Sequence, residues 1–248
     1  VRQEWTERDG DCVLIQRATP VGQEIRRQGE ELRQGTALIE PGRRLNAGHL
    51  AMLAMAGIAE IEVRRAPRIR VLVSGDEVVD AGRSLKPGEV YNANGPLIAA
   101  WLARAGYAQV SVEPLADTDE AVRDGLQRAF AEADLVLTTG GVPVGEKDLI
   151  LPQAEKLGAE RVFWKVAQKP GKPLYVARHG ASLLIGLPGN PASVLVNLAS
   201  FVRRALDVLE AAEERGPVLR MGVISEGVKP DAERDTWLRV RSEVDKTG

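Results

Sequence analysis

The sequence is poor in cysteine and histidine, two side chains that often build metal sites and covalent catalytic centres. Its 248 residues include one cysteine and two histidines. The lone Cys12 excludes an internal disulfide and any metal site made of several thiolates, and we expect it to be a buried neutral thiol. His49 and His179 are isolated and lack metal-ligand spacing, so we expect structural or surface roles for both. No Ser/His/Asp arrangement is visible, which leaves no evident covalent nucleophile.

Long apolar runs and an excess of one charge are also missing. The longest apolar stretch, around residues 50–58, is too short and too rich in Ala and Gly for a membrane span, and no signal peptide is visible. The net charge of -2 indicates neither a nucleic-acid partner nor a membrane surface, so any anion must be bound locally. We therefore expect a cytoplasmic protein. Because the chain starts at Val1 and stops inside an alternating pattern at 239–248, we expect both ends to be truncated.

What is present is the composition of a globular protein, with 44% hydrophobic and 27% charged residues. From residue 68, β-rich runs alternate with helical runs, which predicts βαβ units and a mostly parallel sheet. Expected N-caps are Asn94, either Asp117 or Thr118, and Asn190, which precedes a proline at the first helical position. Strands are expected at 69–73, 108–112, 135–139, 161–166, 173–176 and 183–185. Helices are expected at 96–105, from the Asp117 or Thr118 cap to about 133, from the end of the Gly140-Gly141 loop to 158, and at 191–209.

The flanks of this α/β stretch have a different character. Residues 1–27 are short and β-like, and residues 28–66 combine turn signals with one helical run at 47–56. Residues 213–248 contain β-like runs with no helix between them, so we expect a separate all-β module there. The two runs are 218–224 and 237–244.

Four loops that follow expected strands combine glycine, lysine and carboxylate side chains. Glycine lets a backbone approach a ligand, lysine supplies positive charge, and carboxylates suit a hard divalent cation. In parallel sheets ligands bind beyond the carboxyl ends of the strands, where these loops are expected. The loops are Ser74-Gly75-Asp76-Glu77, Gly140-Gly141-Val142-Pro143-Val144-Gly145-Glu146-Lys147-Asp148, Lys169-Pro170-Gly171-Lys172-Pro173 and Leu187-Pro188-Gly189-Asn190-Pro191.

Several of these residues also have a plainer structural explanation. Glu77 could belong to an exposed acidic turn, and Asp117 and Asp148 could cap the helices that follow them. Glycine loops are common and say little alone. Turn and helix-start chemistry explains Pro188 and Pro191.

Three lysines, Lys165, Lys169 and Lys172, lie within one expected strand and the loop that follows it. A single lysine is most often a solvated surface charge. The Pro and Gly residues around two of these three lysines favour a rigid loop that holds the lysine side chains in a fixed direction instead. Preorganised cations of this kind can bind oxyanions and stabilise developing negative charge.

Several motifs occur in the order and spacing of one known family. Besides the four loops, they include Phe163-Trp164-Lys165-Val166, Tyr91-Asn92-Ala93-Asn94 and Arg26-Arg27-Gln28-Gly29-Glu30-Glu31. Together they resemble the MoeA family, the molybdopterin molybdenumtransferases, which is related to the E domain of gephyrin. The resemblance covers nearly the whole chain, although Pro143 stands where the family usually has serine.

The resemblance implies a reaction and an architecture. The family takes adenylylated molybdopterin, cleaves its phosphoanhydride with the help of Mg²⁺, releases AMP and delivers molybdate to the dithiolene. A MogA-like adenylyltransferase acts upstream, and the enzyme is a homodimer. The implied fold is multidomain α/β plus β, with a central MogA-like three-layer α/β domain of mostly parallel sheet, flanked by elongated and all-β modules. The implied domains are a β-module remnant at 1–27, an elongated linking domain at 28–66, the catalytic α/β domain at 67–212 and a partial C-terminal β domain at 213–248.

The resemblance also assigns roles to single residues. The residues implied to be catalytic are Asp148, Asp117, Glu77, Lys165 and Lys169. The three carboxylates among them are also the implied metal ligands. The residues implied to bind substrate are Gly140, Gly141, Gly145, Lys172, Pro188, Gly189 and Pro191.

Two other functions stay open. An adenylyltransferase that acts on molybdopterin with ATP would have a similar central domain, but that smaller family lacks the flanks at 1–66 and 213–248. A non-catalytic scaffold, like the peptide-binding gephyrin E domain, is disfavoured by the intact carboxylates and lysines.

Overall fold

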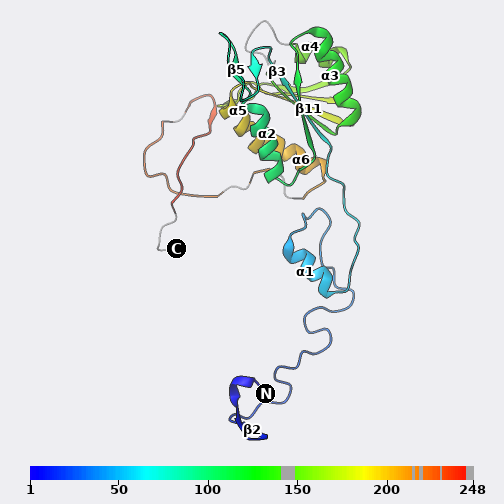
Figure 1. The fold of residues 1–248 in the computed structure, drawn as a ribbon, viewed down its shortest axis with the longest axis vertical. Coiled ribbons are helices and arrows are strands. Elements are labelled where there is room, and N and C mark those ends of the chain that lie inside the picture. Colours follow the sequence, from blue (N-terminus) through cyan, green and yellow to red (C-terminus); the bar gives the residue numbers. More distant parts are fainter. Residues whose placement is uncertain (141–148, 214–215, 218–219, 230, 244–248) are drawn as a thin grey trace. The chain divides into compact units, whose positions relative to one another are not determined.

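The computed structural model describes residues 1–140, 149–213, 216–217, 220–229 and 231–243. The chain divides into two compact units, Val1–Glu62 and Val63–Gly248. Figure 1 follows the chain through both of them.

The first unit begins with a small hairpin. A single 3₁₀ turn, η1 (Gln3–Trp5), leads into β1 (Thr6–Asp9), which pairs antiparallel with β2 (Cys12–Ile15). Every residue of β2 is exposed, because no second layer packs on the hairpin within the described part of this unit. Cys12 is therefore exposed, and the prediction of a buried thiol was wrong.

The helix predicted at 47–56 is confirmed as α1 (Ala47–Met55). It starts at a capping box. The Asn46 side chain accepts the His49 backbone N–H at 3.0 Å, and Nδ1 of His49 accepts the Asn46 backbone N–H at 3.2 Å. His49 thus has a structural role, as expected.

The described residues of the second unit form a six-stranded sheet in which one strand is reversed. In spatial order the strands are β6 (Val110–Leu115), β3 (Ile69–Ser74), β7 (Leu135–Thr139), β11 (Ser182–Leu187), β10 (Tyr175–His179) and β8 (Glu160–Trp164). Neighbours from β6 to β11 are parallel, whereas β10 is antiparallel to both β11 and β8. Five strands therefore point the same way, as the prediction of a mostly parallel sheet requires.

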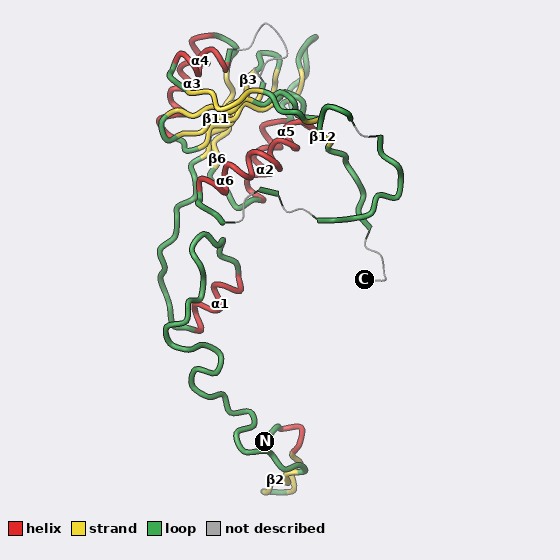
Figure 2. Tube along the Cα trace, turned by 180° about the vertical axis from the view of Figure 1, so that it is seen from behind, coloured by secondary structure: helices red, strands yellow, loops and turns green. Residues whose placement is uncertain are grey.

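Helices cover both faces of this sheet and give three layers (Figures 1 and 2). Strand side chains alternate between the two cores: Val71 and Leu137 face one, and Leu72 and Val136 face the other. No helix in the described ranges is both long and apolar enough to cross a membrane. The first core is covered by α2 (Asn94–Arg104), α5 (Pro191–Asn197), the π turn η2 (Leu198–Val202) and α6 (Arg203–Leu209), and the second by α3 (Asp119–Glu132) and α4 (Ile150–Lys156).

The N-caps of the helices show which polar side chains are used in capping and which are not. Asn190 caps α5, with its Oδ1 accepting the Ala192 N–H at 2.9 Å, as predicted. Thr118, rather than Asp117, caps α3 through an N–H of the first turn at 3.2 Å. The prediction for α2 was wrong, because the helix begins at Asn94 itself and the side chain of Asn92 accepts the Gly95 N–H of its first turn at 2.9 Å.

The strands predicted at 218–224 and 237–244 do not form in the described parts of those segments. Met221 and Val223 are fully exposed, so their alternation has no partner sheet against which to be buried. Instead, β12 (Asp235–Thr236) pairs in parallel with β9 (Gln168–Lys169). A second short parallel pair joins β4 (Val78–Val79) to β5 (Val90–Tyr91).

The amino edge of the sheet is held by Asp134. Its carboxylate accepts the Arg68 N–H at 2.7 Å and two Arg65 N–H groups at 2.6 and 2.9 Å. Its backbone N–H donates to the Arg68 carbonyl at 2.9 Å, and its own carbonyl accepts the Leu183 N–H at 2.9 Å. One residue therefore joins the starts of β3, β7 and β11. The hydrogen bonds from Arg65 and then Arg68 hold the pKa of Asp134 well below its usual range.

We expect Asp134→Asn to lower the free energy of unfolding at pH 7 by about 1–2 kcal/mol, because it removes the charge from these hydrogen bonds. Since the folded-state pKa is depressed, this stability is fully present above the unfolded value of about 4 and is lost as the pH falls through the folded value. Urea unfolding at pH 7, 5 and 3 should show the difference from wild type shrinking. Asp124→Asn is the matched control, because Asp124 on α3 also pairs with an arginine, Arg123, but has a side chain that is 46% exposed. A pH-independent difference at residue 134 would contradict the charge argument.

Candidate active site

The loops that carry the predicted residues lie at one edge of the sheet. Because β3, β6, β7, β8 and β11 point the same way, their carboxyl ends share that edge. The chain leaves these ends through the segments starting at Gly75, Ala116, Gly140, Lys165 and Pro188. The topology therefore brings together loops that are up to 113 residues apart in sequence.

Gly75 and Gly140 are required by close packing at this edge. Gly140 has a φ of +79°, and a Cβ there would lie 2.5 Å from the carbonyl oxygen of Ser74. Gly75 has a φ of +132°, and its Cβ would lie 2.7 Å from the Val78 side chain. A larger residue at position 140 would push the ends of β3 and β7 apart, whereas one at position 75 would adopt a strained φ and displace the Val78 side chain. These contacts explain why both positions are glycine without any need for a ligand. Because glycine has no side chain, the backbone at this edge also stays uncovered.

Carboxylates gather where β3 and β6 end. The Asp76 N–H donates to Oδ2 of Asp117 at 3.3 Å, and the Asp117 N–H donates to Oδ1 of Asp76 at 3.1 Å. Partial burial raises the pKa of Asp117, and the charges of Asp76 and Glu77 raise it further, while N–H groups of Asp76 and Gly75 oppose the rise. Thr118 performs the capping, so the helix start does not account for Asp117. Of the two caps that the sequence left open, Asp117 and Thr118, the structure uses Thr118.

The structure describes two of the three predicted metal ligands. Asp117 and Glu77 influence one another, but Asp148 lies outside the described residues, as do Gly141 and Gly145. Among the residues that the structure describes, no group of three or more His, Cys, Asp or Glu side chains is arranged to hold a metal ion.

Lys165 has an unusual backbone for a lysine. Its φ is +68°, a left-handed conformation that non-glycine residues seldom adopt. Its N–H donates to the Leu174 carbonyl at 2.8 Å, and its Nζ lies 3.9 Å from the centre of the Trp164 ring. The unfavourable conformation and the aromatic contact both give the ammonium group a defined place at the end of β8.

Two buried amides, which the sequence analysis missed, hold the lysine loop. The carbonyl of Gly171 accepts Nε2 of Gln168 at 3.3 Å and Nδ2 of Asn197 at 3.4 Å, and these two amides also bond to each other. Both are almost fully buried. Gly171 itself has a φ of +100° and no room for a Cβ. The amides thereby position Lys169 and Lys172 on either side. The sequence did offer one signal for this pair, because Asn197 is a polar residue within an otherwise apolar run at the end of α5.

A segment near the end of the chain also joins the lysine loop. Beside the β9–β12 pair, the Trp237 N–H donates to the Lys169 carbonyl at 2.8 Å. Hydrogen bonds from the Glu233 N–H and Arg234 lower the pKa of Asp231, and the charge of Lys169 adds to the effect. Pairing between such short and distant segments has no signature in the sequence pattern.

The loop after β11 meets the start of α2. Nδ2 of Asn94 donates to the Gly189 carbonyl at 2.8 Å, so Gly189 and its neighbours Pro188 and Pro191 lie beside that helix. Within the described residues, no hydrogen bond or ion pair joins the lysines to the carboxylates. The edge therefore presents separate anionic and cationic groups.

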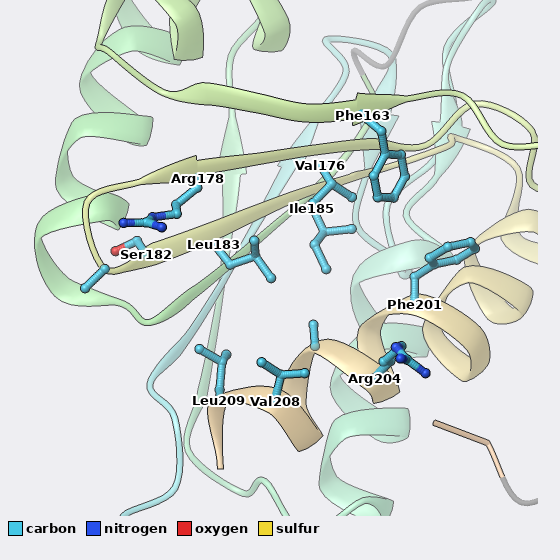
Figure 3. Close-up of a pocket in the computed structure, with 12 residues that line it drawn as sticks. Phe163, Val176, Arg178, Ser182, Leu183, Ile185, Phe201, Arg204, Val208 and Leu209 are labelled. Carbon is cyan, nitrogen blue, oxygen red and sulfur yellow. The ribbon is translucent and has the colours of Figure 1, made fainter. Parts of the chain in front are cut away.

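An apolar cavity of about 320 Å³ lies elsewhere in the second unit (Figure 3). It is lined by residues of β8, β10, β11, η2 and α6, and none of the predicted catalytic, metal or substrate-binding residues lines it. Its polar groups are Arg178, Ser182 and Arg204, and in Figure 3 Arg178 and Arg204 lie at separate ends of it. We assign the site to the carboxyl edge instead, because that edge combines charged groups with exposed backbone.

Two protein families match this chain. The family described as MoeA N-terminal region (domain I and II) matches residues 1–57. The family described as probable molybdopterin binding domain matches residues 70–208.

Similar proteins carry consistent names. The chain is 34% identical over 206 residues to a molybdopterin molybdenumtransferase of Haemophilus influenzae, covering 83% of this chain and 50% of that protein. It is 35% identical over 209 residues to molybdopterin molybdenumtransferase 2 of Mycobacterium tuberculosis, covering 82% and 51%. A crystal structure of a molybdopterin biosynthesis MoeA protein from Pyrococcus horikosii aligns with a TM-score of 0.65 and 27% identity, over 86% of this chain and 53% of that one. The chain spans about half the length of the relatives it matches.

We expect Asp117→Asn to raise the melting temperature at pH 7. Because the folded-state pKa of Asp117 is raised, its ionised form costs stability, and this cost appears as the pH rises above about 4. Thermal unfolding between pH 3.5 and 8 should show the gain at neutral pH vanishing in acid. Asp119→Asn is a control of opposite sign, since Asp119 lies in the first turn of α3 and accepts a hydrogen bond from Gln153. A lower melting temperature for Asp117→Asn at pH 7 would contradict the electrostatic argument.

Proposed function

The chain belongs to the MoeA family of molybdopterin molybdenumtransferases, and on this basis we propose that the full-length protein inserts molybdate into adenylylated molybdopterin and releases AMP. The family named from the sequence motifs is thereby confirmed. The observation that carries the proposal is the convergence of carboxylates after β3 and β6, and of lysines around β8 and β9, at one edge of the sheet. A phosphoanhydride carries negative charge that such cations can stabilise as the bond breaks.

In this proposal Lys165 and Lys169 bind and neutralise the phosphates of the substrate. The buried amides behind Gly171 keep Lys169 in place, so little reorganisation is needed during reaction. Water or a molybdate oxygen attacks the phosphorus on the molybdopterin side of the anhydride, the bond from that phosphorus to the bridging oxygen breaks, and AMP leaves with the bridging oxygen. With water as the attacking group, its proton passes to solvent. The residues proposed to line the substrate are Gly140, Gly141, Gly145, Lys172, Pro188, Gly189 and Pro191.

Mg²⁺ is the metal we propose for the carboxylate side, held by Asp117 and Glu77, with Asp148 as a third ligand. The raised pKa of Asp117 supports this, because a cation would relieve the repulsion from the neighbouring carboxylates. Mg²⁺ commonly takes one or two protein carboxylates and completes its shell with phosphate and water, so the described pair fits. When bound, it would offset negative charge on the phosphate oxygens.

We also propose two partners. One is a second copy of the chain in a homodimer. The other is a MogA-like adenylyltransferase upstream, because adenylylated molybdopterin has to be made by adenylyl transfer.

Two rival functions make different predictions. An adenylyltransferase would transfer AMP from ATP to molybdopterin, and a scaffold would bind a partner without turnover. The match of residues 1–57 to the MoeA N-terminal region favours the insertase over the smaller adenylyltransferase.

The test is AMP release from adenylylated molybdopterin by the full-length protein with Mg²⁺, with and without molybdate. We expect molybdate-dependent release, and we expect Lys169→Ala to lower its rate by roughly 100-fold or more, as for the loss of a preorganised charge-stabilising group. Lys156→Ala, at an exposed position of α4, is the matched control and should retain the rate. Adenylylation of molybdopterin from ATP would instead support the first rival, and neither activity in a folded protein would support the scaffold.

A further inference from the structure

The cavity of about 320 Å³ between the sheet and α6 has apolar, mostly buried walls (Figure 3). Val176 and Ile185, which belong to the first core, are only 7% and 1% exposed there. Leu183, Phe201 and Leu209 pack against the same core and are half-buried. This volume lies within the range of small-molecule sites, and apolar walls of this kind favour an apolar ligand over water.

The mouth of the cavity has a different character from its walls. The lining residues that are exposed to solvent are Arg178, Ala181, Arg204 and Val208. Two of these four are cationic, and no Asp or Glu is among the described residues that line the cavity. Figure 3 places the two guanidinium groups at separate ends of the opening. A molecule that enters therefore meets positive charge first and apolar side chains further in.

The positive charge at the mouth is not balanced by the protein. On α6 the neighbouring Arg203 pairs with Asp207. By contrast, neither Arg178 nor Arg204 forms an ion pair across the ranges that the structure describes. Arg178 uses its Nε to donate to the Gly180 carbonyl at 3.0 Å. Arg204 therefore has the guanidinium group that is more available to a ligand.

The remaining polar side chain of the lining offers no hydrogen to the cavity. The Ser182 hydroxyl donates towards the carbonyls of Phe130 and Ala133, at 3.0 and 2.6 Å, which lie on the opposite face of the sheet. The polar side chains left at the cavity are thus guanidinium groups, which can only donate. A complementary ligand has to present an acceptor, and a carboxylate matches the guanidinium geometry best.

We propose that this cavity is a second ligand site, which binds a small anionic amphiphile, a carboxylate with an apolar chain or ring. Its apolar part packs against Val176, Ile185 and Phe201, and its carboxylate accepts hydrogen bonds from Arg204 at the mouth. None of the residues proposed for AMP release lines this site, so the two proposals succeed or fail independently.

The test uses three probes that share one apolar chain and differ in charge. Binding of octanoate, octan-1-ol and octylammonium to the full-length protein is measured by calorimetry. We expect octanoate to bind about fivefold more tightly than octan-1-ol, and octylammonium to bind most weakly. Arg204→Gln should remove the preference for octanoate over octan-1-ol. Val208→Trp, at a half-exposed position of α6, should fill the mouth and weaken both.

Arg104→Gln is the matched control. It removes the same charge from the last turn of α2, outside the cavity, and should leave the affinity for octanoate unchanged. Melting temperatures without ligand check that each variant is folded. If octanoate does not bind to wild type, if octan-1-ol binds equally well, or if Arg104→Gln has the effect of Arg204→Gln, the proposal is wrong.

Discussion

The shared direction of five strands is the constraint on which the rest of the site depends. It exists because β3, β7 and β11 pair in parallel through buried apolar residues and because Asp134 joins their starts. At the other end, β3 and β7 approach so closely that only glycine fits at position 140. A slip of one residue in this register would exchange the two cores and move every loop at the carboxyl edge, so the site inherits its geometry from the centre of the sheet.

The site itself contains arrangements that work against stability. Asp117 is partly buried beside two other carboxylates, Lys165 has a positive φ, and Asn94 has an unsatisfied acceptor. A bound cation would remove the electrostatic cost at Asp117, whereas the cost at Lys165 is steric and is offset only by the surrounding structure. Features of this kind concentrate at functional sites because the surrounding structure holds them in place. The two layers of helices and the buried Gln168–Asn197 pair supply that support.

Periodicity and caps predicted most of the α/β unit. The six strands of the main sheet, the helices that cover it, the mostly parallel direction and the Asn190 cap follow from local pattern, because they depend on residues close in sequence. The short strands β4, β5 and β9 were not predicted. The errors have a common physical cause. Asn94 was given a cap role from its nearest neighbours and Cys12 a buried place from the usual behaviour of a lone cysteine. The Asn94 side chain instead bonds to Gly189, which is distant in sequence, and Cys12 lies on a hairpin that no second layer covers among the described residues of its unit. The amides Gln168 and Asn197 were missed for the same reason, since they meet only in the folded chain.

At this edge, the charged side chains that the sequence motifs emphasise can bind a substrate but cannot select it. Lysines attract any oxyanion, so Lys165 and Lys169 can stabilise phosphate and molybdate alike and cannot by themselves select the substrate. Selection needs directional neutral groups, because a site built to hydrogen-bond one donor strongly rejects a ligand that lacks it. Binding strength would then come from the cationic loop, and discrimination from uncharged hydrogen-bonding groups of the exposed backbone at the same edge.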